Sequence, residues 1–111
     1  SFKKQKSLLL SKDAESKLVT DTTNAWSKYQ SSESVLKATE SQLKAAEIAN
    51  EGITLEYDSG NTRTTLEVIQ SRSLLLNARI DYAKAQRDFV ISKFELAFNL
   101  GSLSKESIKS L

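Results

Sequence analysis

The second half of the chain carries the most regular pattern of apolar positions. Neither Gly nor Pro occurs from Thr64 to Leu100, which predicts one long helix. With Leu66 taken as heptad position a, positions a and d form a first stripe that is mostly apolar. It consists of Leu66, Ile69, Ser73, Leu76, Ile80, Ala83, Arg87, Val90, Phe94 and Ala97.

A second apolar stripe follows the same helix on heptad positions c and f. At 3.6 residues per turn it lies about 155° around the helix from the first. A two-stranded coiled coil needs only one such stripe, so the pattern predicts a helix with a neighbour on each side, as in a sheet or cylinder of helices. A small antiparallel bundle or a stacked dimer fits the pattern equally well. The second stripe consists of Val68, Ser71, Leu75, Ala78, Tyr82, Ala85, Phe89, Ser92 and Leu96.

Two polar faces separate the stripes, and their charges differ in sign. The first is mainly acidic and contains Glu67, Gln70, Asn77, Asp81, Lys84, Asp88 and Glu95. The second is basic and contains Arg72, Arg79, Gln86 and Lys93.

The first half of the chain predicts a longer helix, from about Lys3 to Tyr57, interrupted only by Gly52. Asn50 falls within its apolar stripe, where it either fixes the register of helix pairing or forms a solvated polar spot near Gly52. The small members of the stripe allow two helix axes to approach closely. The stripe contains Ala25, Tyr29, Ser32, Leu36, Thr39, Leu43, Ala46, Asn50, Ile53 and Tyr57.

Signals for a chain reversal lie between the two predicted helices. Gly60 suits the left-handed conformation that ends a helix, and Thr64 and Glu67 have the spacing of a capping box. Gly101 repeats the stop signal. The sequence therefore predicts an all-α fold, a long antiparallel helical hairpin resembling a coiled coil. Its expected parts are a helix over about 3–57, a tip turn over about 58–63, a helix over about 64–100 and a short tail over 101–111 with one or two weak helical turns.

The predicted hairpin leaves part of the first helix without a mate. In an antiparallel arrangement Leu100 lies beside roughly residue 20, so Leu8, Leu9 and Leu10 project beyond the second helix. We expect these leucines to contact another chain or to be disordered in the isolated segment.

Composition narrows the possible functions. Apolar residues make up 39% of the 111 residues, with one Trp, which suits packing seams better than a globular core. Without Cys or His, the chain lacks thiols, the usual zinc ligands and the usual general bases, so we expect no enzyme activity, metal or cofactor. The formal charge is +2 with both signs interleaved, which predicts no nucleic-acid partner. No apolar run approaches the roughly 18 residues needed to span a bilayer.

Several motifs in order resemble the TolC family of outer-membrane channel proteins. They are "AW" before a long helix, "LKAAEIANEGITLEY" leading into "G", then "TRTTLEVI", "LLLNARIDYAKAQRDF" and the closing "LGSL". Together they cover about Ala25 to Leu103. The chain begins at "SFKK" without an initiator Met, so we expect it to be a piece of a larger protein.

This resemblance implies a role in efflux or type I secretion. The hairpin would belong to the periplasmic α-barrel of a homotrimer in the outer membrane of a Gram-negative bacterium. The tip would dock a periplasmic adaptor protein and, through it, an inner-membrane transporter. The alternative is a soluble coiled-coil hairpin that scaffolds a partner, for which one apolar stripe and a uniformly mixed outer surface are expected.

The resemblance also implies roles for residues near the tip. Tyr57 and Arg63 match positions that latch the closed tunnel to a neighbouring hairpin, although an exposed arginine and a packing tyrosine are an equally good interpretation. Three residues separate Gly60 from Thr64 where the family usually has two, so the tip loop carries one extra residue.

Glu67 and Gln70 match inward-facing positions at the family's constriction, although Glu67 could instead mainly cap its own helix. The face assigned to the lumen contains Glu67, Gln70, Asp81, Asp88 and Glu95, and the exterior face contains Arg72, Arg79 and Lys93.

Overall fold

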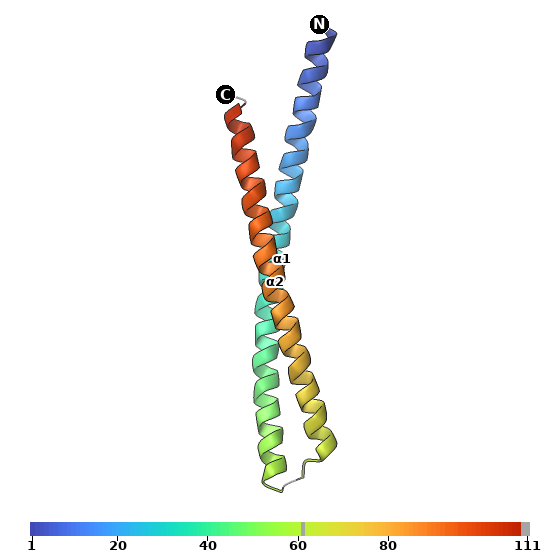
Figure 1. Cartoon of the computed structure of the whole chain (residues 1–111), viewed down its shortest axis with the longest axis vertical. Helices are drawn as coiled ribbons and strands as arrows, with labels where there is room; N and C mark the ends of the chain where they lie inside the picture. The colour runs from blue at the N-terminus through green and yellow to red at the C-terminus, as the bar shows by residue number, and fades with distance from the viewer. Residues whose placement is uncertain (61, 110–111) are drawn as a thin grey trace. The chain divides into compact units, whose positions relative to one another are not determined.

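The fold is all-α and consists of two long helices joined by a short turn (Figure 1). The computed structural model describes residues 1–60 and 62–109. Helix α1 spans Phe2–Asp58 and helix α2 spans Thr65–Lys109, and the described residues include no strand. The expectation of an antiparallel helical hairpin is confirmed. The expected extra residue in the tip loop involves Asn61, which lies outside the described residues.

The hairpin divides into two compact units. The tip unit, Ser32–Phe89, contains the turn and the adjoining parts of both helices. The terminal unit combines Ser1–Ser31 with Val90–Leu111, of which the structure describes residues up to Lys109.

In the tip unit, α1 and α2 pack through residues that recur alternately every three and four positions, as in a coiled coil. These residues are buried or half-buried, whereas most of their neighbours are exposed. The α1 side confirms the predicted stripe except for Tyr57, which is exposed. The seam contains Ser32, Leu36, Thr39, Leu43, Ala46, Asn50 and Ile53 from α1, and Val68, Ser71, Leu75, Ala78, Tyr82, Ala85 and Phe89 from α2.

Large and small side chains face each other across this seam. The Ser71 hydroxyl donates a hydrogen bond of 3.2 Å to Asn50 Oδ1, which places these two residues in one layer. The helices are antiparallel, so each move of three or four residues towards the N-terminus of α1 is matched by an equal move towards the C-terminus of α2. The remaining pairs follow from the Asn50 and Ser71 layer in this way. Only the layer nearest the tip, Ile53 with Val68, joins two branched apolar residues. The other apolar layers are Ala46 with Leu75, Leu43 with Ala78, Thr39 with Tyr82, Leu36 with Ala85 and Ser32 with Phe89.

The terminal unit continues the same type of packing with fewer buried residues. Ala25 of α1 and Ser92 and Leu96 of α2 are buried. Trp26 stacks on Tyr29 with ring centroids 6.0 Å apart. Lys28 Nζ forms an ion pair of 3.1 Å with Glu95 Oε2 across the two helices. Both side chains of the pair are about half exposed, so solvent screens this contact.

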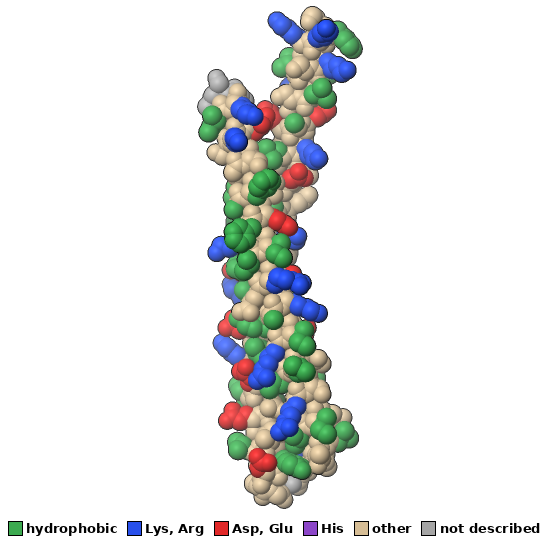
Figure 2. All heavy atoms as spheres, viewed as in Figure 1, with side chains coloured by type: hydrophobic (Ala, Val, Ile, Leu, Met, Phe, Trp, Pro, Cys, Tyr) green, Lys and Arg blue, Asp and Glu red, His purple; other side chains and the backbone are tan. Residues whose placement is uncertain are grey.

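The seam uses the second stripe of α2, and the first stripe is exposed. Within the tip unit Leu66, Ile69, Leu76 and Ile80 are all exposed, and in the terminal unit so are Val90 and Phe94. Figure 2 shows apolar side chains at the surface among charged ones. The structure therefore confirms that α2 carries an apolar stripe beyond the one it needs to pair with α1.

The second helix continues beyond its expected end. The predicted stop at Gly101 is wrong because α2 continues as one helix to Lys109, and the helical turns expected in the tail belong to α2 itself. Ser102, Leu103 and Glu106 are half-buried, and Leu103 lines a small groove together with Val19 of α1. This packing offsets the roughly 1 kcal/mol that a glycine costs inside a helix.

The first helix still presents its early leucines to solvent. Leu8, Leu9 and Leu10 are exposed, and every residue from Ser1 to Lys17 is exposed as well. The structure shows these residues as part of α1, so the expectation of disorder is not supported within this chain. Their contact with another chain stays a prediction.

Two adjacent leucines provide a test of which stripe forms the seam. Leu75 is 8% exposed and Leu76 is 56% exposed. We expect Leu75→Ala to lower the free energy of unfolding by about 2 kcal/mol because it removes buried apolar contacts. Leu76→Ala should change it by less than about 0.5 kcal/mol. Urea unfolding followed by circular dichroism measures both values, and equal losses would contradict the assignment of the seam.

Gly101 provides a test of the corrected end of α2. A Cβ at this position meets no atom within 4 Å, so Gly101→Ala should raise the free energy of unfolding by about 0.5 to 1 kcal/mol through helix propensity. Gly52→Ala is the matched control, because Gly52 lies inside α1 in equally open surroundings. A gain for Gly52→Ala without one for Gly101→Ala, measured by thermal unfolding, would place the end of α2 near Leu100.

Candidate functional site at the hairpin tip

The turn begins after α1 ends at Asp58 and contains Gly60. The Ser59 amide donates to the Leu55 carbonyl at 3.0 Å, and the Gly60 amide donates to the Tyr57 carbonyl at 3.1 Å. Gly60 has φ of 77°, a left-handed conformation that glycine adopts without steric cost. The predicted role of Gly60 is confirmed.

The second helix begins with a complete capping box. The Glu67 amide donates to Thr64 Oγ1 at 3.2 Å, and the Thr64 amide donates to Glu67 Oε2 at 3.3 Å. These reciprocal bonds satisfy two amides that the first turn of a helix leaves without partners. Glu67 therefore caps its own helix, which was one of the two roles considered for it.

Arg63 joins the ends of the two helices. Its Nε donates to Glu56 Oε2 near the end of α1, and its Nη1 lies 3.7 Å from Glu67 Oε2 in the first turn of α2. The hydrogen bond and negative charge of Glu56, with a smaller contribution from Glu67, raise the pKa of Arg63 above its ordinary value. An arginine is protonated at neutral pH in any case, so the contact organises the turn without changing its charge.

Tyr57 spans the turn beside this arginine. Its hydroxyl lies 3.2 Å from Thr65 Oγ1, close enough for a hydrogen bond between the last turn of α1 and the first residue of α2. Both residues of the predicted latch thus make contacts inside their own hairpin. Their contact with a neighbouring hairpin stays a prediction.

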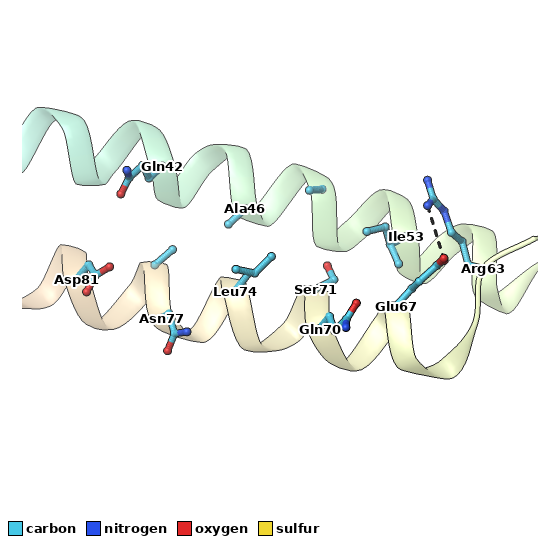
Figure 3. Close-up of a pocket in the computed structure, with 12 residues that line it drawn as sticks. Gln42, Ala46, Ile53, Arg63, Glu67, Gln70, Ser71, Leu74, Asn77 and Asp81 are labelled. Carbon is cyan, nitrogen blue, oxygen red and sulfur yellow. Dashed lines mark ion pairs between the residues drawn. The ribbon is translucent and has the colours of Figure 1, made fainter.

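A groove of about 530 Å³ runs from the tip along one face of the tip unit. Ile53 of α1 and Ser71 and Leu74 of α2 point into the space between the helices (Figure 3). Small residues on both helices leave this face hollow, and polar side chains lie along its edges. The groove is lined by Gln42, Ala46, Ala49, Ile53, Arg63, Glu67, Gln70, Ser71, Leu74, Asn77, Ala78 and Asp81.

Three of the five residues predicted to face a lumen line this groove, namely Glu67, Gln70 and Asp81. Asp88, one heptad beyond Asp81, does not line it and lies 3.4 Å from Arg87 Nη2. Glu95 belongs to the terminal unit, where it pairs with Lys28. The structure therefore brings together the members of the set nearest the tip.

The basic face of α2 has an acidic counterpart on α1. In the register set by Asn50 and Ser71, Glu47 and Glu40 lie on the same edge of the seam as Arg72 and Arg79, each two residues from the level position. On the groove face, Gln42 and Ala49 of α1 carry no charge to balance Asp81. At the tip end of the groove face, Arg63 pairs with Glu56 and Glu67.

Neither a metal site nor a membrane-spanning helix is found among the described residues. No group of three or more potential metal ligands occurs among residues 1–60 and 62–109. Within the same residues, no helix has both the length and the apolar character required to cross a membrane.

Sequence reasoning missed Glu56 and Thr65, which bond Arg63 and Tyr57 across the turn. Glu56 could have been found because heptad spacing places it on the same side of α1 as Gln42 and Ala49, facing the first turn of α2. The groove near Ala49 could also have been predicted, because a small residue beside the seam leaves the seam residues uncovered.

Comparisons of this chain with protein-family models, curated proteins and solved structures gave no match. The geometry of the hairpin and the sequence resemblance are therefore the basis for proposing a function.

The capping box yields a direct prediction. Thr64→Ala removes the hydroxyl that accepts the Glu67 amide, so it should lower the free energy of unfolding by about 1 kcal/mol. Thr64→Ser is the matched control because it keeps an acceptor and should retain most of the stability. Chemical unfolding followed by circular dichroism measures both variants, and an equal loss for the two would show that the hydroxyl does not cap α2.

Proposed function

We propose that this chain forms part of the wall of a trimeric, TolC-like tunnel used for efflux or type I secretion. The observation that carries the proposal is the two-sided helix α2, which buries one apolar stripe against α1 and exposes another. A helix in a wall needs a neighbour on each side, whereas a helix in an isolated hairpin needs only one. The exposed stripe is a surface for the next hairpin.

The outer side of α1 fits this stripe in size. Residues at alternating intervals of three and four positions form an exposed row that is mostly small, ending in Ile48 and Leu55 near the tip. Large residues on α2 of one hairpin could thus face small residues on α1 of the next, as they do within the hairpin. The small members of the row are Ser27, Ser31, Ser34, Ala38, Ser41, Ala45 and Gly52.

Such a contact joins two different surfaces, so it repeats from hairpin to hairpin. Head-to-tail contacts of this kind close into rings when the rotation between neighbours permits. A ring of hairpins encloses a channel, with one polar face of each hairpin inside and the other outside. This geometry supports a tunnel over the alternative, a coiled-coil scaffold, for which one stripe suffices.

The face that contains the groove is the one we assign to the lumen. It carries the acidic residues Glu67, Asp81 and Asp88, whereas the opposite face of α2 carries Arg72, Arg79 and Lys93. Acidic residues repeated around a symmetric tunnel attract cations. In this proposal the tip docks a periplasmic adaptor, the tunnel belongs to the cell outer membrane, and transport energy comes from the adaptor's inner-membrane partner.

Single cysteines distinguish the two faces in the assembled protein. The chain has no native Cys, so Asp81→Cys and Arg79→Cys each introduce a unique thiol. A thiol reagent that enters the pore should alter the single-channel current of the Asp81→Cys protein and leave that of Arg79→Cys unchanged. The opposite result would reverse the two faces.

The mass of the assembled protein tests the tunnel itself. A trimer that conducts ions supports the proposal. A soluble monomer or dimer without conductance would contradict it and favour the coiled-coil scaffold. Leu76→Glu places a charge in the exposed stripe and should prevent assembly without unfolding the hairpin, because Leu76 lies outside the seam.

A further inference from the structure

We propose that Glu56, Arg63 and Glu67 form a charge clamp that holds the tip of the hairpin closed and sets the width of the groove there. The clamp lies within the tip unit and belongs to a single chain. The inference is therefore independent of the proposed tunnel, and its test requires no assembly.

Glu56 and Glu67 share one basic partner, Arg63. Both carboxylates contact the same guanidinium, Glu56 through Nε and Glu67 through Nη1, so they approach each other closely. One belongs to α1 and the other to α2. Without the arginine, two negative charges would repel each other across the hairpin at this point.

Arg63 supplies the positive charge between the two glutamates. Arg63 is the only basic residue in the described part of the segment from Glu56 to Glu67, so no neighbour in the turn can take over its contacts. A planar guanidinium presents several donors in a fixed fork and can serve two carboxylates together. Besides the contact between Tyr57 and Thr65, closure of the tip thus depends on one positive charge between two negative charges.

The clamp forms the tip end of the groove. Arg63 and Glu67 line its tip end, and Figure 3 shows their ion pair at that end. Beyond them the seam has one apolar layer, Ile53 with Val68, before the polar pair Asn50 with Ser71. Release of Arg63 should therefore separate the helices over the last turns and widen the groove.

Spin labels measure this separation in the complete chain. Glu51 and Ile69 are exposed and lie on different helices near the tip, so labelled cysteines at these two positions report the distance between α1 and α2. In this background Arg63→Gln should shift the distance distribution to longer values and broaden it. Exchange of the Gly60 and Val68 amides should become severalfold faster, whereas the circular dichroism of the whole chain should change little.

The decisive variant removes all three charges. Glu56→Gln with Arg63→Gln and Glu67→Gln should return the distance distribution and the exchange rates towards those of the unmodified chain, because no repulsion is left. Gln at position 67 also keeps the capping box, which accepts Glu or Gln at this position. If the triple variant is as open as Arg63→Gln, the arginine acts by its shape and the clamp is refuted.

Two further measurements separate charge from packing. Arg63→Lys retains the positive charge and should stay closer to the unmodified chain than Arg63→Gln. Sodium chloride at about 1 M, where the Debye length falls to about 3 Å, should partly close Arg63→Gln by screening its two carboxylates. An Arg63→Gln distribution that does not respond to salt would contradict the proposal.

Lys28→Gln is the matched control for loss of a cross-helix ion pair. Lys28 pairs with Glu95 alone, without a second carboxylate in that contact, and both residues belong to the terminal unit. The tip distance and the exchange of the tip amides should therefore be unchanged. A comparable opening of the tip in Lys28→Gln would show that the measurements report general destabilisation.

Discussion

The hairpin depends on the pairing of large with small side chains between α1 and α2. Seven-residue periodicity places the large residues of one helix beside the small residues of the other, as in Leu43 with Ala78 and Ala46 with Leu75. Small residues allow the helix axes to approach, and their large partners fill the remaining space, which maintains close packing with few bulky residues. This explains how a chain with one Trp and 39% apolar residues can form a continuous seam. The same pattern has a weakness, because sliding one helix by seven residues again places large residues beside small ones.

Polar contacts near the turn remove this ambiguity of register. The hydrogen bond between Ser71 and Asn50 forms only when these two residues share a layer, and a shift of seven residues would place Asn50 beside Ala78. A partly buried polar pair of this kind adds little stability but penalises the alternatives, which leave a polar group without a partner. Gly60, the capping box and the Arg63 contacts fix the length of the turn and so act in the same direction. Size selects which faces meet, and polar groups select where they meet.

Much of this architecture could be predicted from sequence because it depends on local chemistry. Gly60, Thr64 and Glu67 are close in the chain, and the bonds they form follow from their spacing. The end of α2 could not be predicted in the same way, since the local stop signal at Gly101 is outweighed by packing of Leu103 against α1, a contact between residues distant in sequence. The contact between Arg63 and Glu56 was missed for a related reason, because it depends on how the turn folds back. Periodicity revealed two stripes on α2, but only the pairing of the helices showed which one α1 covers.

The exposed stripe of α2 is the surface through which the proposed wall would extend beyond one hairpin. Leu66, Ile69, Leu76 and Ile80 recur on one side of α2 with the spacing of a helix contact, and contiguous apolar surfaces of this kind usually mark interaction sites. In the proposed wall, the neighbouring helix needs a long surface of small side chains, because a bulky surface would keep the helix axes apart. The exposed row of Ser, Ala and Gly on α1 has this property, so one rule of size complementarity can govern contacts both within a hairpin and between hairpins. A wall built in this way requires no large core, since each helix is stabilised by its two neighbours. Its polar faces are then free to differ in charge, which is the property that a conducting tunnel needs.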